Sequence, residues 1–164
     1  MTTITNITDT GPAVVAREIT DDWWRPLCGK VGFRTRRRLQ TLGQEYVYSP
    51  SSTVVAEGQR ADRFVLIIHG EVEVIVGGEV VATLGEGDYF GEVAMLYTRP
   101  RNPDGAPINL RRTATVRTSR ATRTREFDRA ELMTLLDTVP AVATRISRRA
   151  VGRLGALTTM MAEI

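Results

Sequence analysis

Cysteine and histidine are almost absent from this chain. Its 164 residues include one cysteine, Cys28, and one histidine, His69. A lone cysteine cannot form an internal disulfide, so the cytoplasm is the expected compartment. One cysteine and one histidine cannot build a Cys₂His₂ site or a typical cupin-like metal centre, and a serine triad would have to use His69. We therefore expect no metal and no catalytic residues, and the sequence does not favour an enzyme.

Long apolar runs and nucleotide-phosphate loops are missing as well. No apolar segment approaches membrane-spanning length, and the start "MTTITNITDTGPAV" has neither the basic nor the apolar region of a signal peptide. The chain contains no Walker loop, no G-x-G-x-x-G fingerprint and no G-x-S-x-G elbow. These absences favour a soluble cytoplasmic protein without a membrane partner.

Basic charge is carried almost entirely by arginine. The chain has 22 Lys and Arg residues, of which only Lys30 is lysine, against 19 Asp and Glu, for a formal net charge of +3. One interpretation is a nucleic-acid surface, with "FRTRRRL" at 33–39 as its patch, because arginine suits phosphate. We favour the other interpretation, a solvated helix face in a protein with arginine-rich codon usage.

The remaining composition predicts one domain with three regions. Hydrophobic residues make up 42% of the chain, which is enough for a core. We expect a flexible Thr-rich tail over 1–16, short helices within 17–43 and a β-roll over 44–127. In "IVGGEV", Gly77 and Gly78 can adopt the positive φ angles of a tight hairpin turn.

The last region, 128–164, predicts two helices. Asp128 and Glu131 form a capping box, and Pro140 suits the first turn of the helix that follows. Apolar and small residues then recur at alternating spacings of four and three: Ala143, Ser147, Ala150, Leu154, Leu157, Met161 and Ile164. This seam is typical of a helix that packs on its own domain or on a second copy, and both interpretations remain open.

The stretch "GEGDYFGEVAML", 85–96, crowds three glycines and three carboxylates before a short apolar run. Such a loop can wrap a small polar ligand. Together with "RRTATV", 111–116, it resembles the phosphate-binding cassette of cyclic nucleotide-binding domains. "VVAEGQRADRFVLIIHGEVEV" is similar to the first half of the β-roll of that family. The capping-box helix, Pro140 and "RISRRAVGRL" resemble the hinge and long C-helix of catabolite-activator-type bacterial regulators.

The resemblance implies a mainly β fold with flanking helices. An eight-stranded jelly-roll β-barrel would follow N-terminal helices and precede a hinge helix and a long C-helix. It also implies a receptor for a cyclic nucleotide, with cAMP favoured over cGMP, that signals to an unidentified protein partner. We expect a homodimer through the C-helix. The sequence offers no helix-turn-helix pattern, so we expect a sensor, alone or as part of a longer protein, without DNA binding by this chain.

Specific residues acquire roles through this resemblance. Glu92 would accept the ribose 2′-hydroxyl, Gly91 would bring the backbone close to the ligand, and Arg112 would pair with the cyclic phosphate. The implied ligand-binding residues are Phe90, Gly91, Glu92, Val93, Ala94, Arg112, Thr113 and Ala114, with Val74, Ala82, Leu84, Thr158 and Thr159 as weaker candidates near the base. The alternative for Glu92 and Arg112 is a surface ion pair between two strand ends.

The cassette also departs from the family pattern. A Pro/Gly/Asn/Asp-rich insertion over 99–110 separates its two halves and predicts a loop. We assign the phosphate contact to Arg112 rather than Arg111, because "RTATV" has the register of the family. The insertion supports an alternative function: an interaction protein on the same fold that no longer binds nucleotide and docks through 99–110.

Overall fold

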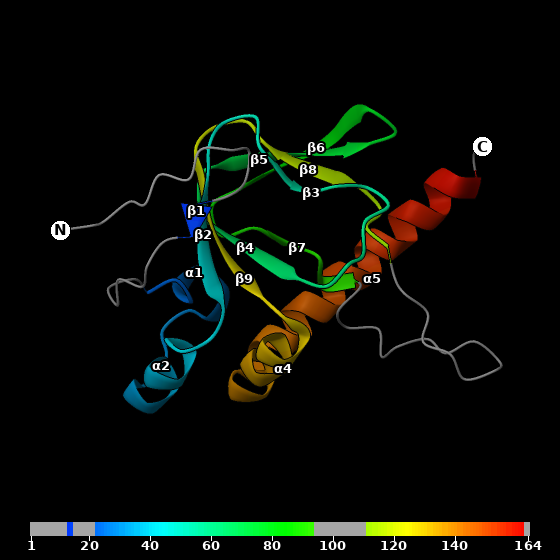
Figure 1. Cartoon of the computed structure of the whole chain (residues 1–164). Coiled ribbons are helices and arrows are strands. Elements are labelled where there is room, and N and C mark those ends of the chain that lie inside the picture. Colours follow the sequence, from blue (N-terminus) through cyan, green and yellow to red (C-terminus); the bar gives the residue numbers. More distant parts are fainter. Residues whose placement is uncertain (1–12, 15–21, 94–110, 163–164) are drawn as a thin grey trace.

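The chain folds into two antiparallel sheets with helices gathered at one end (Figure 1). The structure is a computed structural model that describes residues 13–14, 22–93 and 111–162, with the side chains of 22–93 and 111–153. The five-stranded sheet has the order β1 (Ala13–Val14), β2 (Gln44–Tyr48), β9 (Thr122–Phe127), β4 (Phe64–His69), β7 (Tyr89–Phe90). The four-stranded sheet has the order β3 (Thr53–Val55), β8 (Thr115–Thr118), β5 (Glu71–Val76), β6 (Glu79–Gly85).

The expected fold class, mainly β with flanking helices, is confirmed. The described strands nevertheless form two separate sheets rather than one closed barrel. Among the described strands, β7 pairs with β4 alone and β6 with β5 alone, so both strands are edges of their sheets. β7 is two residues long and offers too short a ladder to join the sheets.

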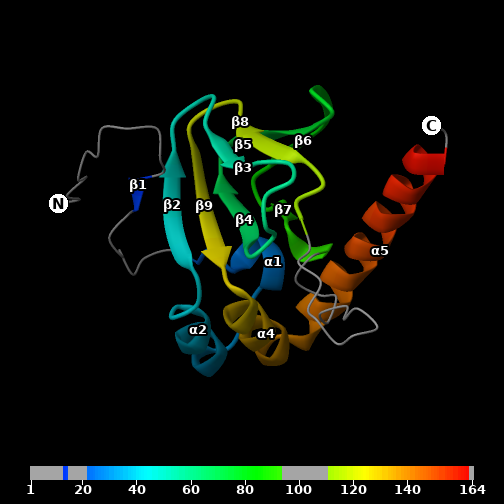
Figure 2. The ribbon, with the colours of Figure 1, turned by 45° about the vertical axis from the view of Figure 1, so that its right-hand side comes forward.

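The helices labelled in Figures 1 and 2 cover the same end of the sheets. They are α1 (Arg25–Cys28), α2 (Phe33–Leu39), α4 (Arg129–Thr138) and α5 (Pro140–Ala162). From that end, α5 extends away past the sheets. No helix in the described ranges has the length and apolar character needed to cross a membrane.

The N-terminal region differs from expectation in one detail. Ala13 and Val14 lie inside the segment expected to be a loose tail, but they pair with β2 as a short strand. α1 and α2 fall within the range expected to be helical. Trp23 and Trp24, just before α1, are 4% and 2% exposed, and the Trp23 ring lies 5.2 Å from that of Phe127 at the end of β9. These aromatic rings attach the N-terminal helices to the sheet.

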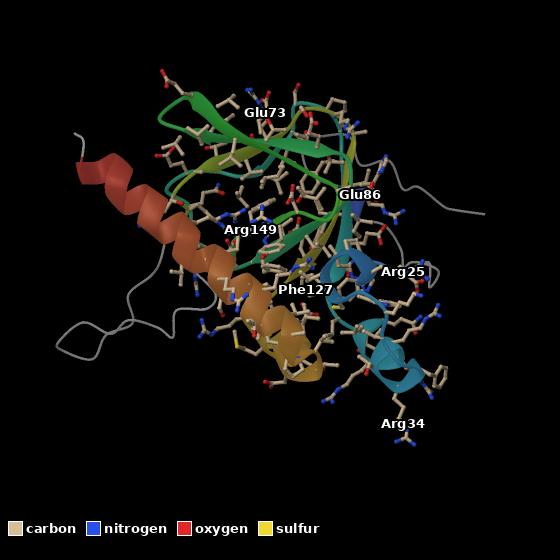
Figure 3. The ribbon with its side chains drawn as sticks, turned by 180° about the vertical axis from the view of Figure 1, so that it is seen from behind. Arg25, Arg34, Glu73, Glu86, Phe127 and Arg149 are labelled. Atoms are coloured by element: carbon tan, nitrogen blue, oxygen red, sulfur yellow. The ribbon has the colours of Figure 1, made fainter. Side chains whose placement is uncertain are left out.

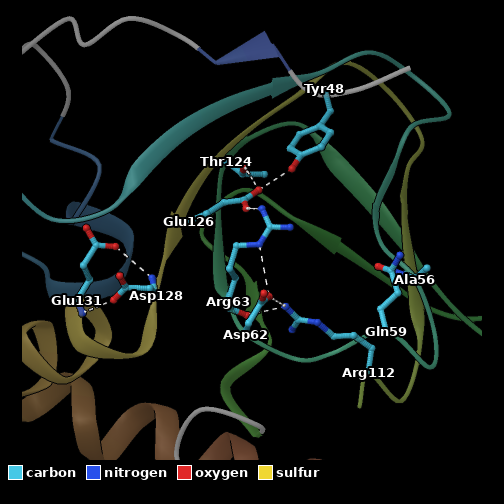
Figure 4. Close-up of polar contacts among 10 residues, drawn as sticks. All are labelled: Tyr48, Ala56, Gln59, Asp62, Arg63, Arg112, Thr124, Glu126, Asp128 and Glu131. Atoms are coloured by element: carbon cyan, nitrogen blue, oxygen red, sulfur yellow. Dashed lines mark hydrogen bonds and ion pairs between the residues drawn. The ribbon is translucent and has the colours of Figure 1, made fainter. Parts of the chain in front are cut away.

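Two local predictions are confirmed. Gly77 and Gly78 have φ angles of 57° and 88°, as a primed turn between β5 and β6 requires. Asp128 and Glu131 form both hydrogen bonds of a capping box at the start of α4, as Figure 4 shows. α5 begins at Pro140.

Of the seam residues whose side chains the structure describes, only Ala150 belongs to the buried face of α5. Val142, Ile146 and Ala150 are at most 3% exposed and pack on the domain itself. Ser147 is exposed, and Ala143 is only partly buried. A spacing of four keeps three side chains on one face of a short helical stretch, and that face is the one the domain covers. The later seam residues lie beyond the described side chains.

Candidate functional site

The two halves of the cassette meet beside the loop between β3 and β4. Phe90 ends β7, and Gly91 and Glu92 follow directly. Arg112 is held from the other side, because its N–H donates to the Gln59 carbonyl at 2.7 Å and its own carbonyl accepts from the Gly58 N–H at 2.9 Å. These backbone bonds join Arg112 to residues 53 and 54 positions earlier in the sequence.

Gly91 occupies a position that only glycine fits. Its φ of +87° lies in the left-handed region, and a Cβ there would collide with the Arg63 carbonyl oxygen and lie 2.8 Å from Arg112 Nη1. The Arg112 guanidinium therefore lies so close to Gly91 that a side chain there would collide with it.

The Arg112 guanidinium is buried, and the positive charge it carries is only partly neutralised by the described residues around it. Arg112 is 8% exposed, and its Nη2 donates to the Arg63 carbonyl at 3.0 Å. The carboxylate that pairs with it belongs to Asp62, which is 3.8 Å away and 56% exposed (Figure 4). Burial lowers the pKa of Arg112, and Asp62 opposes that shift. A buried guanidinium with a distant counter-ion favours an anionic ligand.

Glu92 is completely buried and faces a different arginine. Its Oε1 accepts from Arg153 Nη1 of α5 at 2.6 Å, and Arg153 Nη2 also donates to the Tyr89 carbonyl at 3.0 Å. Within the described residues, Glu92 Oε2 has no hydrogen-bond partner. The alternative of a surface ion pair between Glu92 and Arg112 is therefore wrong: both side chains are buried, and each has other partners.

Arginines at a spacing of four hold α5 against the domain. Arg145 donates to the carbonyls of Pro26 and Leu27 at 3.2 and 3.1 Å. Both terminal nitrogens of Arg149 lie 3.1 Å from Asp88 Oδ1, and its guanidinium stacks 4.8 Å from the Tyr89 ring centroid. Figure 3 shows Arg149 pointing from α5 toward the sheets. Arg153 is the third member of this series.

The remaining predicted residues are distributed differently. Thr113 and Ala114 lie in a bend before β8, so Ala114 is not part of the strand. Val74 and Ala82 face each other across the β5–β6 hairpin. Leu84 and Phe90, 7% and 6% exposed, belong to the core between the sheets. Val93 follows Glu92 in the helical conformation and is partly buried. Ala94, the side chains of Thr158 and Thr159, and the 99–110 insertion lie outside the described residues.

Three residues of the site escaped the sequence analysis. Arg153 had a usable signal, its four-residue spacing from Arg145 and Arg149. Asp62 and Arg63 precede β4 in "RADRF" and carry no local pattern that points to Arg112. Their role depends on a contact across almost fifty residues.

A buried cation, an adjacent glycine and a buried carboxylate with a free oxygen suit a small ligand with an anionic group and a hydroxyl. The family model of the cyclic nucleotide-binding domain matches residues 45–139, more than half of the chain. The chain belongs to the cyclic nucleotide-binding domain family. The resemblance found in the sequence is confirmed.

Relatives in this family include regulatory subunits of kinases. The chain is 44% identical over 78 residues to the cAMP-dependent protein kinase regulatory subunit of Yarrowia lipolytica, covering 46% of this chain and 21% of that protein. It is 43% identical over 54 residues to the cGMP-dependent protein kinase of Toxoplasma gondii, which covers 33% of this chain and 5% of that protein. The chain thus spans about a fifth or less of these relatives. Both relatives come from eukaryotes, so these matches do not support the expectation that the chain is of the bacterial catabolite-activator type.

Solved structures share the fold of this chain. cAMP-bound PfPKA-R superposes with a TM-score of 0.63 at 22% identity, covering 84% of this chain and 45% of that one. The N-terminal domain of a transcriptional regulator from Streptomyces coelicolor A3(2) superposes with a TM-score of 0.56 at 24% sequence identity. The match covers 84% of this chain and 95% of that one. At these identities the likeness shows the fold alone.

Proposed function

We propose that the chain is a regulatory receptor module for a cyclic nucleotide, with cAMP as its ligand. The observation that carries the proposal is Arg112, a buried guanidinium beside the open backbone of Gly91 whose counter-ion is 3.8 Å away. A cyclic phosphate would supply the missing negative charge at that position. The names of the kinase regulatory subunits among its relatives support both the ligand and a non-catalytic role.

The proposed binding mode gives each part of the site one task. Arg112 donates to an exocyclic phosphate oxygen, and the backbone at Gly91 approaches the ligand where a side chain would block it. The amides of Val93 and Ala94 would add further donors to the phosphate. The free Oε2 of Glu92 accepts the ribose 2′-hydroxyl, which satisfies a buried oxygen that otherwise has no described partner.

Base recognition and signalling are proposed for the outer parts of the domain. Val74 and Ala82 would lie beside the base, and Thr113, Thr158 and Thr159 are candidate polar contacts. α5 would carry the signal to a protein partner, because Arg153 connects this helix directly to Glu92. A homodimer through the later part of α5 remains part of the proposal.

Calorimetric titration with cAMP and cGMP tests the function. We expect both to bind, cAMP more tightly, and 5′-AMP, which has the same base and ribose but an open phosphate, to bind much more weakly. No heat with either cyclic nucleotide, confirmed by unchanged thermal stability at saturating ligand, would overturn the proposal. That result would favour the interaction protein docking through 99–110, and deletion of that loop would then abolish partner binding.

A further inference from the structure

A second buried carboxylate belongs to Glu126 of β9. Figure 4 shows Arg63 between this carboxylate and Arg112, the arginine proposed to bind the phosphate. Glu126 is 3% exposed and accepts three hydrogen bonds. Arg63 Nη1 donates to Oε2 at 2.6 Å, while the Tyr48 hydroxyl and Thr124 Oγ1 donate to Oε1 at 2.6 and 3.2 Å. A carboxylate this deep requires such partners, because an unpaired buried charge is strongly destabilising.

The Arg63 side chain is held firmly by this carboxylate. The distance of 2.6 Å to Glu126 is that of a strong charge-assisted hydrogen bond. Burial acts to lower the pKa of Arg63, but Glu126 and its neighbours raise it overall. An arginine keeps its charge at physiological pH, so deprotonation of Arg63 does not release this contact.

The backbone of the same residue supports the phosphate site. The Arg63 carbonyl accepts from Arg112 Nη2 at 3.0 Å, and it is the oxygen against which a side chain on Gly91 would collide. Asp62, one residue earlier, has its Oδ1 3.7 Å from Arg63 Nε and 3.8 Å from Arg112 Nη2. The carbonyl that accepts from the Arg112 guanidinium therefore lies on Arg63, the residue that Glu126 holds, and the nearby Asp62 carboxylate lies one residue earlier.

We propose that Glu126 is a positioning residue for ligand binding: by holding Arg63, it fixes the carbonyl that aims the Arg112 guanidinium at the cyclic phosphate. This inference rests on the proposed function. Without the anchor, the peptide after Arg63 can rotate, and Arg112 loses a fixed acceptor. Arg112 must then be ordered by the ligand itself, which reduces affinity without removing any group that touches the ligand.

The test is Glu126→Gln, which keeps the shape of the side chain and removes its charge. We expect about a tenfold loss of cAMP affinity by calorimetry, within the range of coupling between interacting residues. The matched control is Glu73→Gln, which removes another cross-strand glutamate–arginine pair, 3.0 Å from Arg117 in the other sheet, and should leave affinity unchanged. In an Arg112→Ala background, Glu126→Gln should cause no further loss. An equal loss in both backgrounds would overturn the proposal.

A second measurement does not depend on ligand binding. The Arg112 Nε–H resonance in a ¹⁵N spectrum of the free protein should shift or broaden in Glu126→Gln and stay unchanged in Glu73→Gln. If the wild type binds no cyclic nucleotide but this resonance responds, the proposed function fails, and with it the role in ligand binding, while the ordering of Arg112 by Glu126 stands. If the wild type binds and the resonance is unchanged in Glu126→Gln, the positioning role fails.

A milder variant protects the test against misfolding. Tyr48→Phe removes one of the hydrogen bonds to Glu126 and leaves the Arg63 pair in place. We expect a loss of about threefold in affinity that again disappears in the Arg112→Ala background. The proposal would be contradicted if Tyr48→Phe folds and lowers the affinity by the same factor in the Arg112→Ala protein as in the wild type.

Discussion

Arg153 Nη1 donates to Glu92 Oε1 at 2.6 Å, so a residue of α5 holds the carboxylate proposed for the ribose. The two residues are 61 positions apart, and Glu92 is completely buried while Arg153 is 29% exposed. Because Oε2 is free among the described residues, ligand and helix can use the same carboxylate at once. Occupancy of the site and the position of α5 are thereby physically connected.

Replacing this arginine should loosen the helix. We expect Arg153→Met to raise amide hydrogen exchange in the last turns of α5 and to lower the free energy of unfolding by about 1–3 kcal/mol, because Glu92 stays buried without its cation. Arg148→Met is the control, since Arg148 is exposed on the same helix. Equal exchange in the two variants would show that the contact does not hold α5.

Loss of Arg112 should weaken binding without unfolding the domain. A charge-assisted hydrogen bond contributes about 1.5–3 kcal/mol, so Arg112→Ala should reduce cyclic nucleotide affinity by about 10- to 100-fold in calorimetry. Arg111→Ala is the matched control, because the Arg111 side chain is exposed and donates to the Gly58 carbonyl at 2.7 Å. If Arg111→Ala caused the loss and Arg112→Ala did not, the register of the cassette would be wrong.

A methyl group at Gly91 should damage the site in two ways. Gly91→Ala combines a φ of +87° with a collision against the Arg63 carbonyl, so both stability and affinity should fall. Gly77→Ala separates the effects, because Gly77 has a φ of +57° but open space around it. We expect Gly77→Ala to cost about 1 kcal/mol in thermal unfolding and to leave affinity intact. Comparable affinity losses would argue against a steric role for Gly91.

Dimerisation should depend on the later part of α5. Up to Ala150, the buried face of the helix is used by its own domain, whereas Val151 is 66% exposed. Leu154→Glu combined with Leu157→Glu should give a folded monomer in sedimentation, and the wild type a modest dimer. A wild type that stays monomeric at high concentration would show that the seam serves its own domain.

The base preference should lie with α5 rather than with the cassette. Threonine hydroxyls can accept from the adenine amine or donate to the guanine carbonyl, so chemistry allows both ligands. We expect cAMP to bind more tightly than cGMP. Thr158→Val should reduce this difference in affinity more than Thr113→Val does. A competition titration measures this directly, and displacement of cAMP by an equal or lower concentration of cGMP would refute the preference.

Features that depend on neighbouring residues could be predicted from the sequence alone. The Gly77–Gly78 turn and the Asp128–Glu131 capping box were predicted because φ preferences and helix caps act over a few positions. The family of the chain followed from two short motifs. For the candidate site, the sequence predicted Gly91, Glu92 and Arg112, but it did not predict which residues contact their side chains.

Only the tertiary structure decided how these pieces meet. It separated the strands into two sheets, and it chose the face of α5 that the domain buries. It also paired Glu92 with Arg153 and Arg63 with Glu126, contacts that join residues 61 and 63 positions apart. In a chain so rich in arginine, many cations could pair with each carboxylate, and the choice depends on which ones the packing of the helices and sheets buries together.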